Sequence, residues 1–411
     1  MFKREFYLEK IESGLKQVPI VVLIGARQVG KTSLMKLFSE HKTSLFINGQ
    51  DVEVAALFEK LSTIEQYLKI FLNEQMKGVL LIDEFQYIDG ISTTLKLLTD
   101  KHEGLKVLCS GSSSLDILQR VEESLAGRVR VIEVLSLSFS EYLLFCDEKL
   151  HQLFQSLDLD TGSSALTLPI EQLFSEYLLF GGLPRAALTK NKEEKIEILD
   201  DIYKTYLMHD VRSYIKNEHS VGFNKLLRIL AAQIGNLVNV NELSRESGLP
   251  YKACEEYLYL LEQMYIIKLI EPYFVNKRKV INKMKKVYFC DLGLRNMIER
   301  NFNEIEFRVD NGAVFENALL LALWRNKGAG SELQFYRTAD GAEVDFLLSR
   351  PTGKMALECK YKKMAKPVSL QTLNGFCEEE DIAQKYIVNL NLNTVHNGTK
   401  LIQGFLADKV R

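Results

Sequence analysis

The sequence predicts an α/β protein whose N-terminal part is built on a parallel β-sheet. Apolar runs at 21–24, 78–82 and 105–109 support this class. Apart from Lys106, these runs contain no polar side chain, as is typical of strands that helices cover on both faces. Stretches with helical periodicity separate the runs, and this alternation is typical of parallel strands joined by crossover helices. A chain of 411 residues is long enough for about two or three domains.

A phosphate-binding loop follows the first apolar run. Residues 25–32 are GARQVGKT, which fits the spacing G-x-x-x-x-G-K-[ST] between a predicted strand and a predicted helix. The glycines let the backbone curl so that N–H groups point at a phosphate, and the helix dipole adds to the attraction. We expect Lys31 to reach the β- and γ-phosphates of ATP and Thr32 to bind Mg²⁺. An ordinary glycine-containing turn is the alternative. The predicted nucleotide contacts are Gly25, Ala26, Arg27, Gln28, Val29, Gly30, Lys31, Thr32 and Ser33.

Two acidic residues end the second apolar run, GVLLIDEF. We expect Asp83 to hold Mg²⁺ through water and Glu84 to act as general base on the attacking water. Acids at an exposed strand end would give the same pattern, but the distance from the loop fits one βαβ unit and favours a nucleotide site. Ser110 ends the third run, so we expect it between the loop and Asp83, where it would sense the γ-phosphate. The serines at 112–114 fit a helix cap almost equally well.

Two arginines are candidates for phosphate contacts. Arg128 lies in LAGRV, where a charged finger would reach a phosphate of its own chain or of a neighbouring subunit. Arg27 lies inside the phosphate loop. Either arginine fits a solvated side chain as well. A finger that acts on a neighbouring subunit would require a homo-oligomer.

The segments GARQVGKT, LLIDEF, SGSSS, LAGR, SLSFSEYL and FGGLPRA occur in this order. Together they resemble the AAA-type ATPases of bacteria and archaea that carry a domain of unknown function at the C-terminus, and the resemblance extends through nearly the whole chain. It implies an AAA-type P-loop NTPase sheet with a helical lid, and the helical stretch 171–217 fits that lid. The phosphate-loop, strand-end and sensor positions that the resemblance implies are Lys31, Thr32, Asp83, Glu84 and Ser110.

The middle of the chain predicts a winged helix. The amphipathic helices expected here are 223–238, 240–248 and 251–267. A short helix followed by a longer one matches a helix-turn-helix, and the following residues fit two strands around a basic loop. A winged helix that serves only for packing is the alternative, and Glu255 and Glu256 oppose base reading by the third helix. The residues expected to contact DNA phosphates are Lys277, Arg278, Lys279, Lys283, Lys285 and Lys286.

The last third predicts a small α/β domain with a metal site. Residues 332–338 and 342–349 fit a β-hairpin, and 354–363 fits a third strand. Glu358 and Lys360 share a face of that strand, because strand residues two apart point the same way. Asp345 on the adjoining strand can meet them. Two carboxylates and a lysine suit one divalent cation, with Lys360 orienting or deprotonating the hydrolytic water.

This arrangement resembles the PD-(D/E)XK nucleases, in which Glu316 matches the acid of the preceding helix. The resemblance implies a restriction-endonuclease-like fold in which Glu316, Asp345, Glu358 and Lys360 form the catalytic site. A surface strand with one charged face is the alternative, and such folds are often reused without catalysis.

Composition narrows the class of protein. The net charge of −2 excludes a global field that recruits nucleic acid, so such contacts must be local. We expect no membrane span, because no apolar run approaches about 20 residues. We expect no signal peptide, because the N-terminal residues MFKREFYLEK carry both charge signs and no apolar h-region. The six cysteines form no C-x-x-C pair, so we expect neither a disulfide framework nor a zinc site. This cysteine usage favours the reducing cytoplasm.

The predicted domains are a P-loop ATPase core (1–165), a helical lid (166–220), a winged helix (221–290) and a PD-(D/E)XK nuclease-like domain (291–411). They predict a Mg²⁺-dependent ATPase that acts on DNA through its winged helix and nuclease-like domain. The alternative is a nucleotide-operated switch or partner-binding protein with a catalytically silent nuclease-like fold.

Overall fold

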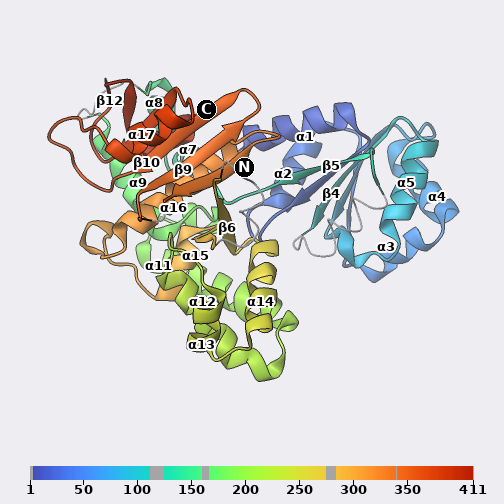
Figure 1. Ribbon diagram of the computed structural model, residues 1–411. Helices are drawn as coiled ribbons and strands as arrows, with labels where there is room; N and C mark the ends of the chain where they lie inside the picture. The colour runs from blue at the N-terminus through green and yellow to red at the C-terminus, as the bar shows by residue number, and fades with distance from the viewer. Residues whose placement is uncertain (1–2, 112–124, 160–165, 275–283, 339, 411) are drawn as a thin grey trace. The chain divides into compact units, whose positions relative to one another are not determined.

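The computed structural model describes residues 3–111, 125–159, 166–274, 284–338 and 340–410 (Figure 1). The chain forms two compact units, one of Met1–Leu135 with Gln263–Tyr265, and one of Ser136–Glu262 with Ile266–Arg411. Helices and strands carry the labels of Figure 1, and each unit is described by itself.

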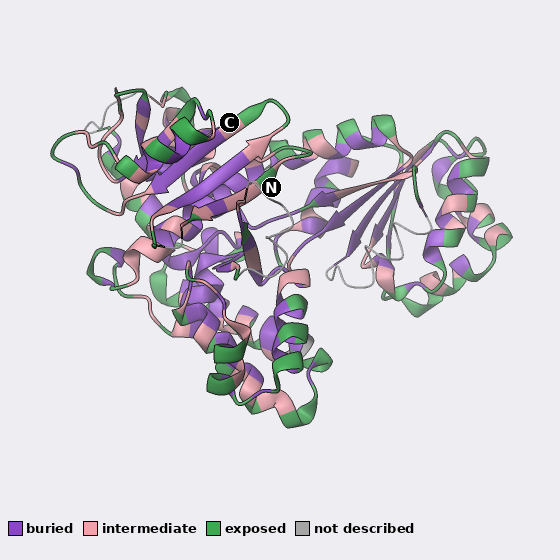
Figure 2. Ribbon diagram, viewed as in Figure 1, coloured by how far each residue is buried: buried purple, intermediate pink, exposed green. Residues whose placement is uncertain are grey.

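The first unit contains the predicted parallel sheet. Its strands are β1 (Ile20–Ile24), β2 (Ser44–Asn48), β3 (Gly78–Asp83), β4 (Leu105–Gly111) and β5 (Val129–Glu133). Their order in the described part of the sheet is β2-β3-β4-β1-β5, and each neighbouring pair is parallel. Every residue of β1 is buried, as expected for a central strand that helices cover (Figure 2). The predicted parallel sheet is therefore confirmed.

The helices described in this unit are α1 (Glu5–Gln17), α2 (Lys31–Ser39), α3 (Val52–Ala56), α4 (Leu61–Leu72) and α5 (Ile91–Lys101). Helices α1, α2, α4 and α5 pack against the sheet, whereas α3 has no buried residue. The helical stretch between β2 and β3 is interrupted, because Lys60 adopts an extended conformation between a 3₁₀ turn and α4. Asn73, with a φ of 81°, ends α4.

The second unit contains a mixed sheet. Its strands are β6 (Ile267–Pro272), β7 (Lys286–Phe289), β8 (Glu332–Arg337), β9 (Glu343–Arg350), β10 (Gly353–Cys359), β11 (Gln384–Asn389), β12 (Thr394–His396) and β13 (Thr399–Gln403). Strands β8 and β9 form the predicted antiparallel hairpin, and β10 adds to β9 in antiparallel fashion. Strands β10, β11 and β13 are parallel.

Helices cover this sheet and extend beyond it. They are α7 (Phe139–Cys146), α8 (Glu148–Ser156), α9 (Leu168–Phe180), α10 (Pro184–Ala187), α11 (Lys192–Ile202), α12 (Ser220–Ala232), α13 (Val240–Ser247), α14 (Tyr251–Gln263), α15 (Leu292–Glu299), α16 (Asn311–Asn326) and α17 (Gln371–Glu379). Helix α17 packs Leu373 and Phe376 against Val344 of β9 and Ala356 of β10. Because side chains alternate along a strand, Asp345 points to the other face, toward α16.

Residues 180–182, the FGG segment, were predicted as part of a lid. In the structure they form a close contact between two helices of the second unit. Asp291 accepts hydrogen bonds from the backbone N–H of Gly182 (2.8 Å) and of Leu294 (3.0 Å). A Cβ on Gly293 would lie 2.1 Å from the carbonyl oxygen of Phe180. The end of α9 and the start of α15 therefore touch through their backbones, and glycine is required for this close approach.

The first unit ends at Leu135, whereas the sequence predicts an ATPase core that extends to 165. Helices α7 and α8 belong to the second unit, where the backbone N–H of Ser140 donates to Asp408 (2.8 Å) near the C-terminus. Partners so far apart in sequence leave no local pattern from which this boundary could be predicted.

The antiparallel strands β6 and β7 follow helices α12, α13 and α14, and the winged helix that the sequence predicts here stays a prediction. Gly248 ends α13 with a φ of 76°. The strands differ from a free-standing wing, because β6 also pairs with β8 and so joins the C-terminal sheet. This pair is therefore one edge of the eight-stranded sheet that the described residues form.

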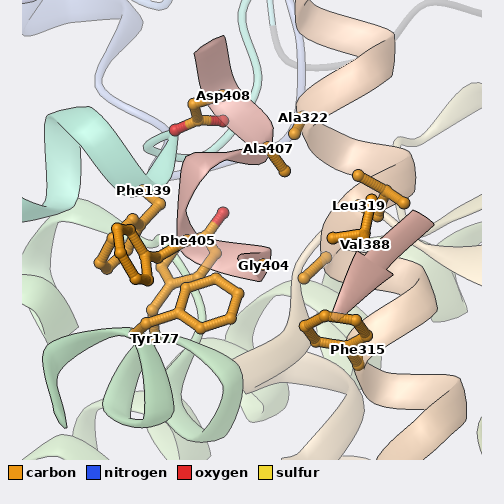
Figure 3. Close-up of a pocket in the computed structure, with 12 residues that line it drawn as sticks. Phe139, Tyr177, Phe315, Leu319, Ala322, Val388, Gly404, Phe405, Ala407 and Asp408 are labelled. Carbon is orange, nitrogen blue, oxygen red and sulfur yellow. The ribbon is translucent and has the colours of Figure 1, made fainter. Parts of the chain in front are cut away.

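An apolar cavity of about 10 Å³ lies among α7, α9, α16 and the C-terminal segment (Figure 3). The rings of Phe139, Phe174 and Tyr177 line it, and Phe315 closes one side. A space of this size holds at most one water molecule. This cavity is therefore a small packing defect and is too small to bind a ligand. In the part of the chain that the structure describes, no helix has the length and apolar character needed to cross a bilayer.

Candidate nucleotide site and acidic site

The phosphate loop is shaped by two glycines. Gly25 follows β1 with a φ of 152°, and a Cβ there would lie 2.1 Å from the carbonyl oxygen of Val134. The loop is held this close because the backbone N–H of Val134 donates to the carbonyl of Ile24 (2.7 Å). Gly30 has a φ of 95°, and α2 starts at the next residue. The loop thus leads from a buried strand to a helix N-terminus, the geometry that binds phosphate.

Lys31 lies buried over the loop. Its Nζ donates to the carbonyls of Gly25 (2.9 Å) and Ala26 (2.8 Å). Burial lowers the pKa of Lys31 to about 8, against the opposing charges of Glu84 and Asp83. At pH 7 the ammonium is therefore still mostly protonated and can bind a phosphate oxygen.

The hydroxyls of Thr32 and Ser110 hold the carboxylate of Asp83. Thr32 Oγ1 donates to Asp83 Oδ2 (2.8 Å), and Ser110 Oγ donates to Asp83 Oδ1. Strand β4 lies between β3 and β1, so Ser110 lies between the loop strand and the Asp83 strand as predicted. Its hydroxyl contacts Asp83, however, which gives it a positioning role besides the predicted sensing of the γ-phosphate. Hydroxyl and carboxylate oxygens are ligands that Mg²⁺ prefers, so Thr32 and Asp83 fit this ion.

Glu84 follows in a left-handed conformation with a φ of 51°. Its Oε2 accepts a hydrogen bond from Gln86 Nε2 (2.6 Å). Gly49 leaves room for this turn, because a Cβ there would lie 2.5 Å from the carbonyl oxygen of Glu84. Gln86 and Gly49 also belong to the site, and the sequence analysis predicted neither. The only indication in the sequence was that Gln86 is a polar residue two positions after Glu84.

Arg128 does not lie where a finger for its own chain's nucleotide is needed. It precedes β5, and its carbonyl accepts from the backbone N–H of Ile20 at the start of β1. The phosphate loop follows the other end of β1, so Arg128 lies at the opposite edge of the sheet. Its Nε donates to Asp100 Oδ1 (2.6 Å) at the surface. The prediction that Arg128 reaches a phosphate of its own chain is therefore wrong.

The second site gathers the predicted acids of the C-terminal third. Asp345 Oδ2 accepts from the backbone N–H of Cys359 (2.7 Å), and the backbone N–H of Asp345 donates to Glu358 Oε2 (3.4 Å). Lys360 Nζ donates to Glu358 Oε1 (2.7 Å). Burial raises the pKa of Glu358, and the charge of Glu316 on α16 adds to this rise. We name the carboxylates of Glu316, Glu343, Asp345 and Glu358 the acidic site.

Two further residues complete the acidic site. Tyr288 donates its hydroxyl to Glu316 Oε1 (2.5 Å), and Lys286 Nζ donates to the same oxygen (3.0 Å). Lys286 also forms an ion pair with Glu343. Both residues belong to β7 and lie two positions apart, so they point to the same face.

The predicted basic patch is corrected at the positions that the structure describes. Lys286 is buried among carboxylates and cannot contact DNA phosphates. Lys285 forms an ion pair with Glu271 (2.9 Å), so its charge is already balanced by an acid outside the basic run. Lys277, Arg278, Lys279 and Lys283 lie outside the described residues.

Burial raises the pKa of three of these carboxyls, Glu316, Asp345 and Glu358. The pKa of Glu316 rises to about 7, because desolvation and the charge of Asp345 outweigh Lys286. The pKa of Asp345 rises to about 6 through desolvation and the charge of Glu358. In the described part of the chain, no three Asp, Glu, His or Cys side chains converge as a ready metal cage. Asp345 and Glu358 alone fit the predicted single cation.

These raised pKa values make stability depend on pH. The unfolded carboxyls have a pKa of about 4, so the native state binds more protons between about pH 4.5 and pH 7. The free energy of unfolding therefore decreases as pH rises through the folded values of about 6 for Asp345 and about 7 for Glu316. We expect Glu316→Gln to remove about 1–3 kcal/mol of this decrease between pH 5 and pH 7.5, measured by urea unfolding with EDTA present.

The matched control is Glu332→Gln, which changes an exposed acid of β8 in the same unit. It should keep the wild-type pH dependence. A wild-type slope in Glu316→Gln would show that Glu316 titrates normally.

Three family models match separate parts of the chain. Residues 17–143 match the model of an AAA domain. Residues 171–304 match a domain of unknown function, DUF8612, and residues 311–403 match another, DUF4143. The descriptions of these last two matches give no activity.

Whole-chain relatives are similar along most of their length. The chain is 26% identical over 383 residues to an uncharacterized protein of Methanocaldococcus jannaschii, covering 88% of this chain and 82% of that protein. It is 25% identical over 367 residues to an uncharacterized protein of Mycobacterium tuberculosis, covering 86% and 73%.

Among solved structures, a Walker-type ATPase of Pyrococcus abyssi aligns with a TM-score of 0.52 and 16% identity, covering 73% of this chain and 96% of that chain. This likeness shows a shared fold, and it agrees with the parallel sheet and the phosphate loop described above. Residues 17–143 therefore match an AAA domain, and the chain shares the fold of a Walker-type ATPase.

Proposed function

We propose that the chain binds and hydrolyses Mg²⁺·ATP in its first unit and uses the nucleotide state to act on DNA through its second unit. The observation that carries the second part is the convergence of Asp345, Glu358 and Lys360, with Glu316 from α16, in one buried site. They come from α16, from β9 and from the end of β10, and Glu316 precedes Asp345 by 29 residues. A charged surface strand would not bring them together.

In the nucleotide site, each residue has a separate task. Lys31 binds the β- and γ-phosphates from its position over the loop. Thr32 and Asp83 would hold Mg²⁺, which neutralises charge on the phosphates when bound. Ser110 keeps the Asp83 carboxylate oriented. Glu84, at the end of the strand, accepts a proton from the attacking water.

In the acidic site, Asp345 and Glu358 would hold a divalent cation, and Lys360 would orient or deprotonate water. The cation would stabilise charge that develops on the scissile phosphate. Lys360 is suited to its task because it is the partly exposed member of the site, with a side chain 40% accessible. Helices α12–α14 would position the nucleic acid as a winged helix does.

Location and assembly belong to the same proposal. None of the six cysteines, all of which the structure describes, is in a disulfide, which favours the reducing cytoplasm. Because Arg128 lies away from the loop of its own chain, a phosphate contact by this residue would require a second copy of the chain.

The test is to incubate the purified protein with a panel of DNA and RNA forms, with and without ATP and Mn²⁺. We expect cutting of at least one form, and we expect Lys360→Ala to reduce the rate at least about tenfold with ATP hydrolysis unchanged. The control is Lys363→Ala, an exposed lysine three positions further along. Equal cutting by Lys360→Ala and wild type would remove Lys360 from the chemistry.

A second candidate function is a nucleotide-operated switch or partner-binding protein with a silent nuclease-like fold. The ion pairs of Lys286 favour it, because they occupy Glu316 and Glu343 without a metal. Absence of cutting by the wild type on every substrate, with ATP hydrolysis intact, would support this candidate.

A further inference from the structure

Lys286 is the most enclosed cation of the acidic site. Its side chain is 4% accessible, and its Nζ pairs with Glu316 and Glu343. Burial lowers the pKa of Lys286, but the charges of Glu316, Asp345 and Glu343 outweigh burial and leave it raised. The lysine is therefore charged at neutral pH, and the carboxylates around it are the reason.

The backbone holds Lys286 in this position from both sides. Strand β7 pairs with β6 through Ile270 and Lys286. On the other side, the backbone N–H of Val238 donates to the carbonyl of Lys285 (2.8 Å), and that of Val287 donates to the carbonyl of Asn236 (3.1 Å). The ammonium thus has a fixed place, unlike that of a lysine on a loop.

The two lysines of the acidic site differ in what they neutralise. Lys360 pairs with Glu358 and is 40% accessible. Lys286 reaches the acids that Lys360 does not, Glu316 and Glu343, and it also acts on Asp345 through charge. A cluster of buried carboxylates without such a cation would be strongly destabilised.

We propose that Lys286 is a resident counter-ion of the acidic site, which stabilises the carboxylates without a metal and weakens the binding of a divalent cation by competing with it. This inference rests on the proposed metal site of Asp345 and Glu358, and it holds whether or not that site cuts nucleic acid. A divalent cation needs the carboxylate charge that Lys286 neutralises. When the ammonium of Lys286 is removed, the negative charge of the carboxylates is no longer neutralised and attracts an incoming cation more strongly.

The experiment titrates Mn²⁺ into nucleotide-free protein by calorimetry. We expect Lys286→Met to bind Mn²⁺ at least about tenfold more tightly than wild type at the acidic site, the effect of one nearby charge on an ionic equilibrium. The control is Lys285→Met, the preceding residue, which pairs with Glu271 instead. It should bind Mn²⁺ as the wild type does.

The double variant Lys286→Met/Asp345→Asn separates this site from the Mg²⁺ ligands of the nucleotide site. The gain in affinity should disappear in the double variant, because Asp345 would ligate the added cation. A gain that persists there, or equal affinity of Lys286→Met and wild type, would overturn the inference.

If Lys286→Met folds only with a cation present, thermal melting shows it. Mn²⁺ should then restore a cooperative transition and raise its midpoint, while the wild-type midpoint shifts less. A variant that stays unfolded in Mn²⁺ would contradict the inference, since the metal could not replace the ammonium. These readouts do not depend on cutting, so failure of the proposed nuclease activity would be seen separately.

Discussion

Replacing Glu84 by Gln is expected to slow ATP hydrolysis by about 10²–10⁴-fold, the usual contribution of a general base, while ATP still binds. The amide has nearly the size of the carboxylate, and its oxygen can still accept the hydrogen bond from Gln86 Nε2. It cannot accept a proton from water at neutral pH. Lys31 keeps its hydrogen bond to the loop carbonyl of Gly25, and Thr32 keeps its hydrogen bond to Asp83. Phosphate release and binding of a fluorescent ATP analogue measure the two quantities.

Two variants frame this result. Lys31→Ala should lose ATP binding, because it removes the ammonium over the loop. Asp89→Asn removes an exposed acid five residues from Glu84 and should leave both quantities unchanged. Equal turnover by wild type and Glu84→Gln would exclude Glu84 as the general base.

The nucleotide site was predictable because its signals are local. A strand, the glycine loop 25–32 and a helix follow one another directly in the sequence. Asp83 and Glu84 come at the end of another strand. Once the strands are parallel, their carboxyl ends meet at one edge of the sheet. The contact between Thr32, Asp83 and Ser110 follows from that geometry.

The acidic site was predictable only in part. Hairpin geometry placed Asp345 beside Glu358, and the spacing of two placed Lys360 with it. Lys286 was assigned to DNA because it belongs to a basic run, although KVYF also contains an alternation that puts Lys286 and Tyr288 on one face. Its burial depends on Glu316, thirty residues later, and no local pattern contains that partner.

The unit boundary and the FGG segment show the same limit. The sequence analysis identified the motif FGGLPRA and interpreted it as part of a lid. That interpretation did not predict the hydrogen bond from the backbone N–H of Gly182 to Asp291. The only sign of the close backbone contact between α9 and α15 in the sequence is the presence of glycines. Glycines also occur in turns, so they do not by themselves indicate such a contact. Their structural reason becomes visible only when both helices are placed.

Gly293→Ala is expected to lower the free energy of unfolding of the second unit by about 3 kcal/mol or more, at the upper end of the overpacking range. The added Cβ would lie 2.1 Å from the carbonyl oxygen of Phe180 and 3.1 Å from Leu199 Cδ2. The first of these is a backbone atom, so no rotamer change relieves the clash. Helix α9 and helix α15 would have to separate, and the hydrogen bonds of Asp291 to Gly182 and Leu294 would lengthen.

Trp324 makes this measurable, because it is the only tryptophan of the chain and lies in α16 of the second unit. Its fluorescence during urea unfolding therefore reports the second unit alone. The control is Gly312→Ala, at a helical position of α16 where a Cβ would meet nothing within 4 Å. Alanine there should leave stability unchanged or raise it by about 0.5–1 kcal/mol. If both variants unfold at the same urea concentration, the backbone contact between α9 and α15 is looser than 2.1 Å implies, and FGG is not the joint that holds these helices.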